Sequence, residues 1–126
     1  MTKDYGNREE WNTGKNKTVL KVEDFRLCFN GRFGAVHAVR DANLEVRRGE
    51  IVALVGESGC GKSATCRAIM GLLACNAAVE SGSILLEGED LLRKSKREMR
   101  KIRGARIAMI FQDPMTALDP TMRIGR

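Results

Sequence analysis

The stretch Gly56-Glu57-Ser58-Gly59-Cys60-Gly61-Lys62-Ser63 decides the fold of this 126-residue chain, and it matches the pattern G-x-x-x-x-G-K-[ST]. Five consecutive apolar residues, 51–55, stand just before it, and residues 62–73 after it keep apolar side chains at helical spacing. A continuous apolar run of this length predicts a strand that is covered on both faces, as in the middle of an α/β sheet. Strand, glycine-rich loop and helix, in this order, are the context in which the pattern binds phosphate.

Each residue type in the loop has a chemical reason to be there. The glycines allow φ values closed to other residues and bring backbone N–H groups against phosphate oxygens. A helix starting at Gly61 points free N–H groups and the positive end of its dipole at the same anion. Lys62 supplies a full charge for the β- and γ-phosphates, and Ser63 offers a hydroxyl to Mg²⁺. The alternative is a glycine-rich turn that binds nothing. The nucleotide-binding hypothesis names Gly56, Glu57, Ser58, Gly59, Cys60, Gly61, Lys62, Ser63 and Ala64.

The rest of the chain predicts short strands joined by turns, and few helices. Apolar residues in rough alternation and clusters of turn residues give the boundaries. Upstream of the loop, strands are predicted over Val19–Phe29, Val36–Val39 and Ala42–Val46, with turns at residues 30–32 and 47–50. Downstream, the pattern predicts a strand over Gly82–Glu87, a polar helix over Lys94–Arg103 that ends at Gly104, and a buried strand over Arg106–Phe111.

Composition excludes several classes of protein. With 43% apolar and 30% charged residues the chain is typical of globular domains, and its longest apolar runs, five residues each, are too short to span a membrane. Residues 1–18 are polar and mixed in charge, which predicts a flexible leader and not a secretory signal. The four cysteines form no C-x-x-C pair, and the single histidine, His37, is not near any of them in the sequence, so no zinc site or disulfide framework is expected. These features favour a reducing, cytoplasmic compartment.

Basic residues are concentrated near the end of the chain. The net charge is +6, and residues 93–106 hold eight lysines and arginines against one acid, Glu98. Such a cluster could bind nucleic acid or could be a solvated helix face. Aromatic residues make up only 5% of the chain and none lies in the cluster, so bases would find no stacking platform there. We therefore favour the solvated face.

Three stretches together resemble one family. Residues 33–39 leading to 43–46, the loop at 56–63 and residues 107–120 are similar to the N-terminal portion of an ABC-type ATPase. The closest resemblance is to the ATP-binding subunits of dipeptide, oligopeptide and nickel importers. It implies an α/β P-loop NTPase core with an antiparallel β subdomain over residues 19–126, and ATP and Mg²⁺ as cofactors. The loop alone would also fit GTPases, kinases and helicases.

The resemblance also implies roles for residues outside the loop. Gln112 matches the glutamine that meets Mg²⁺ and the attacking water, in a loop joining the core to a helical subdomain that touches the permease. Phe33 falls where family members stack adenine on an aromatic ring. Phe29 is the alternative, because the turn between the two could shift the register. Ala64 departs from the family, since many relatives carry there a hydroxyl that bonds the α-phosphate.

Other family motifs do not occur in the sequence. They are the Leu-Ser-Gly-Gly signature, the second Mg²⁺ carboxylate with its catalytic glutamate, and the switch histidine, since His37 lies upstream of the loop. We therefore expect a chain truncated after the glutamine loop that binds nucleotide and hydrolyses little alone. The resemblance implies permease subunits and a second ATP-binding subunit as partners, at the inner face of the cell membrane. A soluble ABC-type ATPase acting on nucleic acid, and a non-catalytic remnant, are the alternatives.

Overall fold

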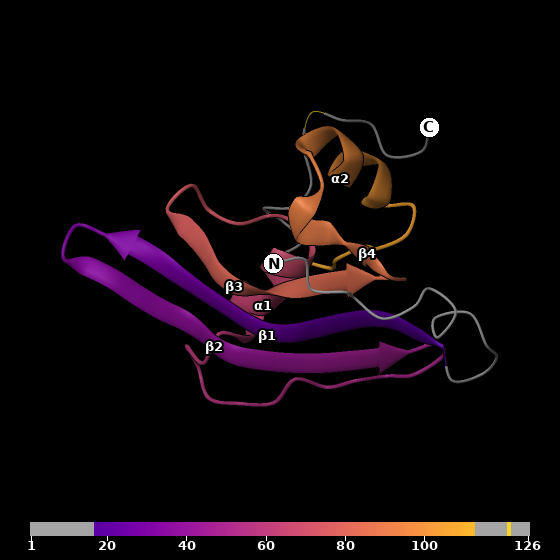
Figure 1. Ribbon diagram of the computed structural model, residues 1–126, viewed down its shortest axis with the longest axis horizontal. Coiled ribbons are helices and arrows are strands. Elements are labelled where there is room, and N and C mark those ends of the chain that lie inside the picture. Colours follow the sequence, from indigo (N-terminus) through magenta and orange to yellow (C-terminus); the bar gives the residue numbers. More distant parts are fainter. Residues whose placement is uncertain (1–16, 113–120, 122–126) are drawn as a thin grey trace, which may run out of the picture.

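The computed structural model describes residues 17–112 and residue 121. Four strands in this part of the chain form an antiparallel sheet in the order β2-β1-β3-β4 (Figure 1). Most of the predicted leader, and residues 113–120 of the third resembling stretch, lie outside the described residues. The elements, in chain order, are β1 Thr18–Gly31, β2 Gly34–Arg47, α1 Lys62–Ile69, β3 Ala77–Leu86, β4 Glu89–Asp90, the 3₁₀ helix η2 Leu91–Arg93 and α2 Lys96–Ile102.

A long hairpin of β1 and β2 is the largest part of the sheet. It confirms the strand predicted over Val19–Phe29, whereas the two short strands predicted after it are one strand, β2. Asp41, with a φ of 50°, lies between those two predicted strands and marks an irregularity within β2. A two-residue turn, Arg32 and Phe33, closes the hairpin between the paired Gly31 and Gly34.

A bulge in β1 explains why its alternation is only approximate. Val22, Phe25 and Leu27 are all buried, although strict alternation would turn Val22 and Phe25 to opposite faces. The ladder shifts register between Val22 and Phe25, where Asp24 has a φ of 45°. Gly82 on β3 approaches this bulge so closely that a Cβ would stand 2.5 Å from the Cα of Phe25. The bulge thus requires a glycine on the neighbouring strand.

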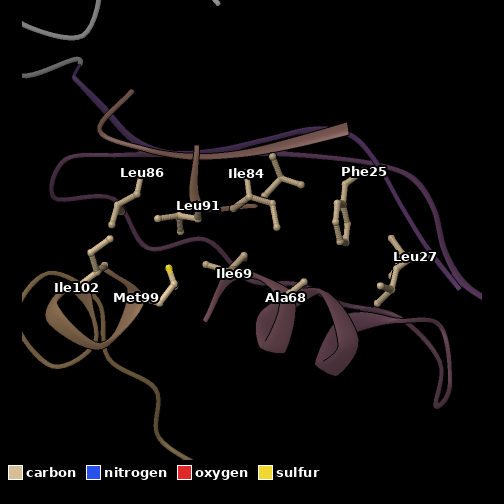
Figure 2. Close-up of a cluster of buried hydrophobic side chains, with 11 residues drawn as sticks. Phe25, Leu27, Ala68, Ile69, Ile84, Leu86, Leu91, Met99 and Ile102 are labelled. Carbon is tan, nitrogen blue, oxygen red and sulfur yellow. The ribbon is translucent and has the colours of Figure 1, made fainter. Parts of the chain in front are cut away.

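The hydrophobic core lies between the sheet and the two helices, which cover the same face (Figure 2). Phe25, Leu27 and Ile84 from the sheet have no exposed surface and face α1, which contributes Ala68 and Ile69. At the other end of the core, α2 and η2 close it against β3 with Met99, Ile102, Leu91 and Leu86. Each of these large apolar side chains contributes about 1.5–3 kcal/mol of transfer free energy when it is fully buried.

α1 is shorter than the helix predicted over residues 62–73. It ends at Ile69 because the N–H groups of Gly71 and Leu72 turn back to the carbonyls of Ala68 and Arg67, the pattern of a Schellman motif. The Arg103 guanidinium then donates to the carbonyl oxygens of Met70 (2.8 Å) and Gly71 (2.9 Å). The end of α1 is therefore held by the segment that follows α2.

α2 begins two residues later than predicted, at a capping box. The Ser95 hydroxyl accepts from the Glu98 N–H, and the Glu98 carboxylate accepts from the Ser95 N–H. Several of the basic residues predicted to form one solvated face have structural partners instead. Lys94 and Arg106 pair with Glu89, Arg93 pairs with Asp90, and Arg103 holds α1. The basic cluster of the sequence is thus divided between ion pairs and an exposed helix face.

The sequence predicts buried strands over residues 51–55 and 106–111, and both predictions are wrong. Residues 51–55 and 108–111 form no strand, and only Arg103 and Ile107 make an isolated bridge. Ile51 is 98% exposed and Ile110 is 97% exposed. A strand needs a neighbour for its N–H and C=O groups, and none of the four described strands pairs with either segment. Among the described residues, the sheet is therefore antiparallel, and residues 51–55 and 108–111 take no part in it.

Candidate functional site

The glycine-rich loop packs directly against the hairpin. Gly61, the residue before α1, has a φ of 92°, and a Cβ there would stand 2.3 Å from the Ala38 carbonyl oxygen of β2. No L-residue with a side chain could hold this position without moving one of the two segments. Gly61 therefore allows the loop to pack this closely against β2.

Lys62 folds back over the loop. Its Nζ donates to the carbonyl oxygens of Gly56 and Glu57, both at 2.6 Å, and lies 3.2 Å from the Cys60 Sγ. A full positive charge is therefore held at the loop by backbone carbonyls and not by a carboxylate. A point charge held this way remains available to an anion that enters the loop.

The first turn of α1 is open to a ligand. No side chain caps the helix at Gly61, and its first turn has no acidic residue. The first N–H groups of a helix have no partner within the helix, and they carry the positive end of its dipole. The Thr65 hydroxyl donates to the Gly61 carbonyl and so leaves these N–H groups alone. The loop and the helix together form an anion-binding geometry.

A cavity of about 450 Å³ lies at this point. The loop and the start of α1 provide one wall, and the hairpin provides the other. The residues that line it are Phe29, Ala38, Ser58, Gly59, Gly61, Lys62, Ser63, Ala64 and Arg67. A smaller cavity of about 210 Å³ shares Phe29, Ala64 and Arg67 with it and is otherwise lined by Leu72, Leu73 and Ala74. Polar groups thus gather at the loop end and apolar groups at the other.

The predicted site residues divide into those that reach this cavity and those that do not. Phe29 lines it, whereas Phe33 lies in the hairpin turn and is fully exposed. Gly56, Glu57 and Cys60 are not lining residues, although all three contact Lys62. Gln112 is exposed and does not line the cavity. The structure therefore brings together the loop and Phe29 but neither Phe33 nor Gln112.

Two lining residues, Ala38 and Arg67, were not predicted. Ala38 carries no chemical signal in the sequence, because only the tight contact of β2 with Gly61 brings it to the loop. Arg67 could have been found, since it lies four residues after Ser63 and such residues share one face of a helix.

The Cys60 thiol is acidified by its neighbour. The Lys62 ammonium, hydrogen-bonded to the sulfur, lowers the pKa of Cys60 because it stabilises the thiolate. The opposite holds for Cys28 in β1, where desolvation raises the pKa of the thiol. Cys60 is exposed and Cys28 is buried. The Cys60 thiol of the loop therefore ionises more readily than the buried Cys28 thiol of the sheet.

Two other features bear on the choice of site. Among the described residues, no group of three or more His, Cys, Asp or Glu side chains could hold a metal ion. A cavity of about 520 Å³ over the sheet is larger than the loop cavity, but two carboxylates, Asp41 and Glu80, line it beside its basic residues Arg26, His37 and Arg40. Arg26 pairs with Asp41 and His37 with Glu80, whereas no described carboxylate lines the loop cavity. The loop cavity is therefore the stronger candidate for an anionic ligand.

Comparison with known proteins agrees with this class of site. The family model described as ABC transporter matches residues 39–126. The chain therefore belongs to the ABC transporter family, and its antiparallel sheet is part of an ABC transporter ATPase domain.

Several curated relatives are similar over most of the chain. It is 53% identical over 108 residues to the probable D,D-dipeptide transport ATP-binding protein DdpD of Escherichia coli, covering 85% of this chain and 33% of that protein. The dipeptide transport ATP-binding protein DppD of Bacillus subtilis is also 53% identical, covering 85% and 32%. The oligopeptide transport ATP-binding protein OppD of Bacillus subtilis is 47% identical, covering 86% and 30%. The chain spans about a third of the length of these relatives. Within the described ranges, no helix is long and apolar enough to cross a bilayer.

Proposed function

We propose that this chain binds the triphosphate of Mg-ATP in the loop at residues 56–63. The observation that carries the proposal is the Lys62 ammonium, held by the Gly56 and Glu57 carbonyls beside the uncapped start of α1. A phosphate chain is bound by three features: an ammonium ion, the free N–H groups at the start of a helix, and a glycine-rich loop whose backbone N–H groups come close to the phosphate oxygens.

The residues present fit Mg²⁺ and a nucleotide base as well. Mg²⁺ prefers oxygen ligands and keeps much of its water shell, so the Ser63 hydroxyl beside the phosphates suits it. The match to the family glutamine assigns the neutral amide oxygen of Gln112 to the same ion, although Gln112 is exposed and does not line the cavity. For the base, Phe29 is the better candidate than Phe33, because Phe29 lines the cavity. When bound, Mg²⁺ neutralises phosphate charge, and the side chains named here hold and orient the nucleotide.

We further propose that the chain belongs to the energy-coupling subunit of an importer for peptides or nickel. The relatives named above are transport ATP-binding proteins for dipeptides and oligopeptides, and the identity extends over most of this chain. Such a subunit would work with permease subunits and a second ATP-binding subunit, on the cytoplasmic face of the membrane. Hydrolysis would require the signature motif and a catalytic glutamate, neither of which is among these 126 residues.

Isothermal titration with Mg-ATP tests the binding proposal. We expect saturable binding by the wild-type chain and at least about a tenfold weaker affinity for Lys62→Ala, because a charge-assisted contact contributes about 1.5–3 kcal/mol. Arg97→Ala, which removes an exposed charge of α2, is the matched control and should bind like wild type. Wild-type affinity in Lys62→Ala would contradict the proposal.

A salt titration with duplex DNA tests the alternative of an ATPase that acts on nucleic acid. Four of the eight basic residues in 93–106 have structural partners, so few charges remain for phosphates. We expect weak binding that disappears between 50 and 200 mM salt, roughly as non-specific contacts do. Tight binding that persists at the higher salt would favour the alternative.

A further inference from the structure

Of the described residues that line the smaller, apolar cavity of the candidate site, Arg67 is the one with a charged side chain. It lies on α1 four residues after Ser63, which is about 6 Å further along the helix axis. It lines both the loop cavity and the smaller cavity beside it, together with Phe29 and Ala64. It is exposed, and among the described residues no group accepts a hydrogen bond from its guanidinium. Its charge is therefore not used by the fold.

The two cavities together have the polarity of a nucleotide. The loop cavity offers an ammonium, a hydroxyl and backbone N–H groups, which suit phosphates. The smaller cavity offers Leu72, Leu73 and Ala74, which suit a flat apolar ring. Phe29 and Arg67 belong to both cavities and so lie at the junction between the phosphate end and the base end.

We propose that Arg67 is a specificity-determining residue that holds the nucleotide base against Phe29. An aromatic ring and a planar guanidinium are the two side-chain surfaces on which a base stacks. A base entering the junction would meet Phe29 with one face and Arg67 with the other. This inference rests on the proposed function, and it assigns Arg67 to the base and not to the phosphates, although its charge alone would suit either.

Two ligands separate the base from the phosphates. Wild type, Arg67→Ala, Arg67→Lys and Lys62→Ala are titrated with Mg-ATP and with inorganic tripolyphosphate, which has no base. We expect Arg67→Ala to bind ATP about tenfold more weakly and tripolyphosphate as wild type does, since a desolvated cation–π contact contributes about 1–2 kcal/mol. Arg67→Lys should stay weak for ATP, because lysine restores the charge but not the flat surface. Lys62→Ala should weaken both ligands.

The outcomes distinguish this inference from the proposed function. Equal weakening of both ligands by Arg67→Ala would make Arg67 a phosphate contact and overturn the inference. Full recovery in Arg67→Lys, or no change in Arg67→Ala, would overturn it as well, while ATP binding by wild type would still support the proposed function. If wild type bound neither ligand, the proposed function itself would be contradicted. Unchanged tripolyphosphate binding in Arg67→Ala also reports that the variant is folded.

Discussion

Two apolar segments of this chain, β1 and residues 51–55, differ in burial and in strand pairing. In β1, Phe25 and Leu27 have no exposed surface, and the strand is paired along both edges with β2 and β3. Residues 51–55 are more uniformly apolar, yet Ile51 is 98% and Val55 is 92% exposed, and no described strand pairs with them. The difference teaches that apolar composition predicts where a strand can form, whereas partners for the backbone decide whether it does.

Truncating one residue in each segment is the strongest test of this difference. Phe25→Ala should lower the free energy of unfolding by about 3–5 kcal/mol, because it leaves a cavity in the core. Ile51→Ala should change it by less than about 0.5 kcal/mol, because an exposed side chain loses few contacts. Urea denaturation followed by circular dichroism measures both. A loss in Ile51→Ala close to that of Phe25→Ala would mean that residues 51–55 are buried after all.

The bulge of β1 offers a second test, because its geometry depends on the close approach of Gly82 in β3. Gly82→Ala should destabilise the chain by about 3 kcal/mol, because it combines a strained φ with contact against β1. Gly104→Ala is the matched control: its φ of 80° is also positive, but no atom lies within 4 Å of the added Cβ. Its cost should be the backbone strain alone, about 1–2 kcal/mol. Equal costs for the two variants would argue against the close approach of β3 to the bulge.

Arg103 links the end of α1 to the segment that follows α2. It follows α2, holds the carbonyls of Met70 and Gly71 at the end of α1, and precedes residues 108–111, which belong to no strand. Arg103→Met should cost about 1–2 kcal/mol in the free energy of unfolding, because two carbonyls lose a charged donor. Arg97→Met on α2, where the side chain is exposed, should stay within about 0.5 kcal/mol of wild type. If both variants unfolded alike, Arg103 would not hold α1.

The sequence predicted local features well and long-range pairing poorly. The strand over Val19–Phe29, the glycine-rich loop and the start of a helix at Lys62 follow from alternation, composition and motif, and all depend on neighbouring residues. The prediction that residues 51–55 are buried is wrong, because burial of that segment depends on a neighbouring strand. The bulge at Asp24 required knowledge of Gly82, which is far away in the sequence.

In the candidate site, too, local features were predicted from the sequence and long-range contacts were not. The loop residues that line the cavity, such as Lys62 and Ser63, were predicted from the motif. The aromatic lining residue is Phe29 and not Phe33, because the hairpin turns at residues 32 and 33 and carries Phe33 away from the loop. Counting along the sequence could not locate that turn to the residue. Ala38 reaches the site only through the contact of β2 with Gly61.

Protection of Cys60 from alkylation tests the central claim, that phosphates occupy the loop beside Lys62. Because Lys62 lowers the pKa of Cys60, its thiolate forms at lower pH than in Lys62→Met, and its reaction with iodoacetamide should begin at correspondingly lower pH. Mg-ATP at ten times its dissociation constant should slow that reaction by about tenfold, by mass action. Cys75, which is exposed, lies outside the loop at residues 56–63 and has no hydrogen bond to Lys62, should react at an unchanged rate. Peptide mass spectrometry that found Cys60 and Cys75 alkylated equally fast with and without Mg-ATP would contradict the account.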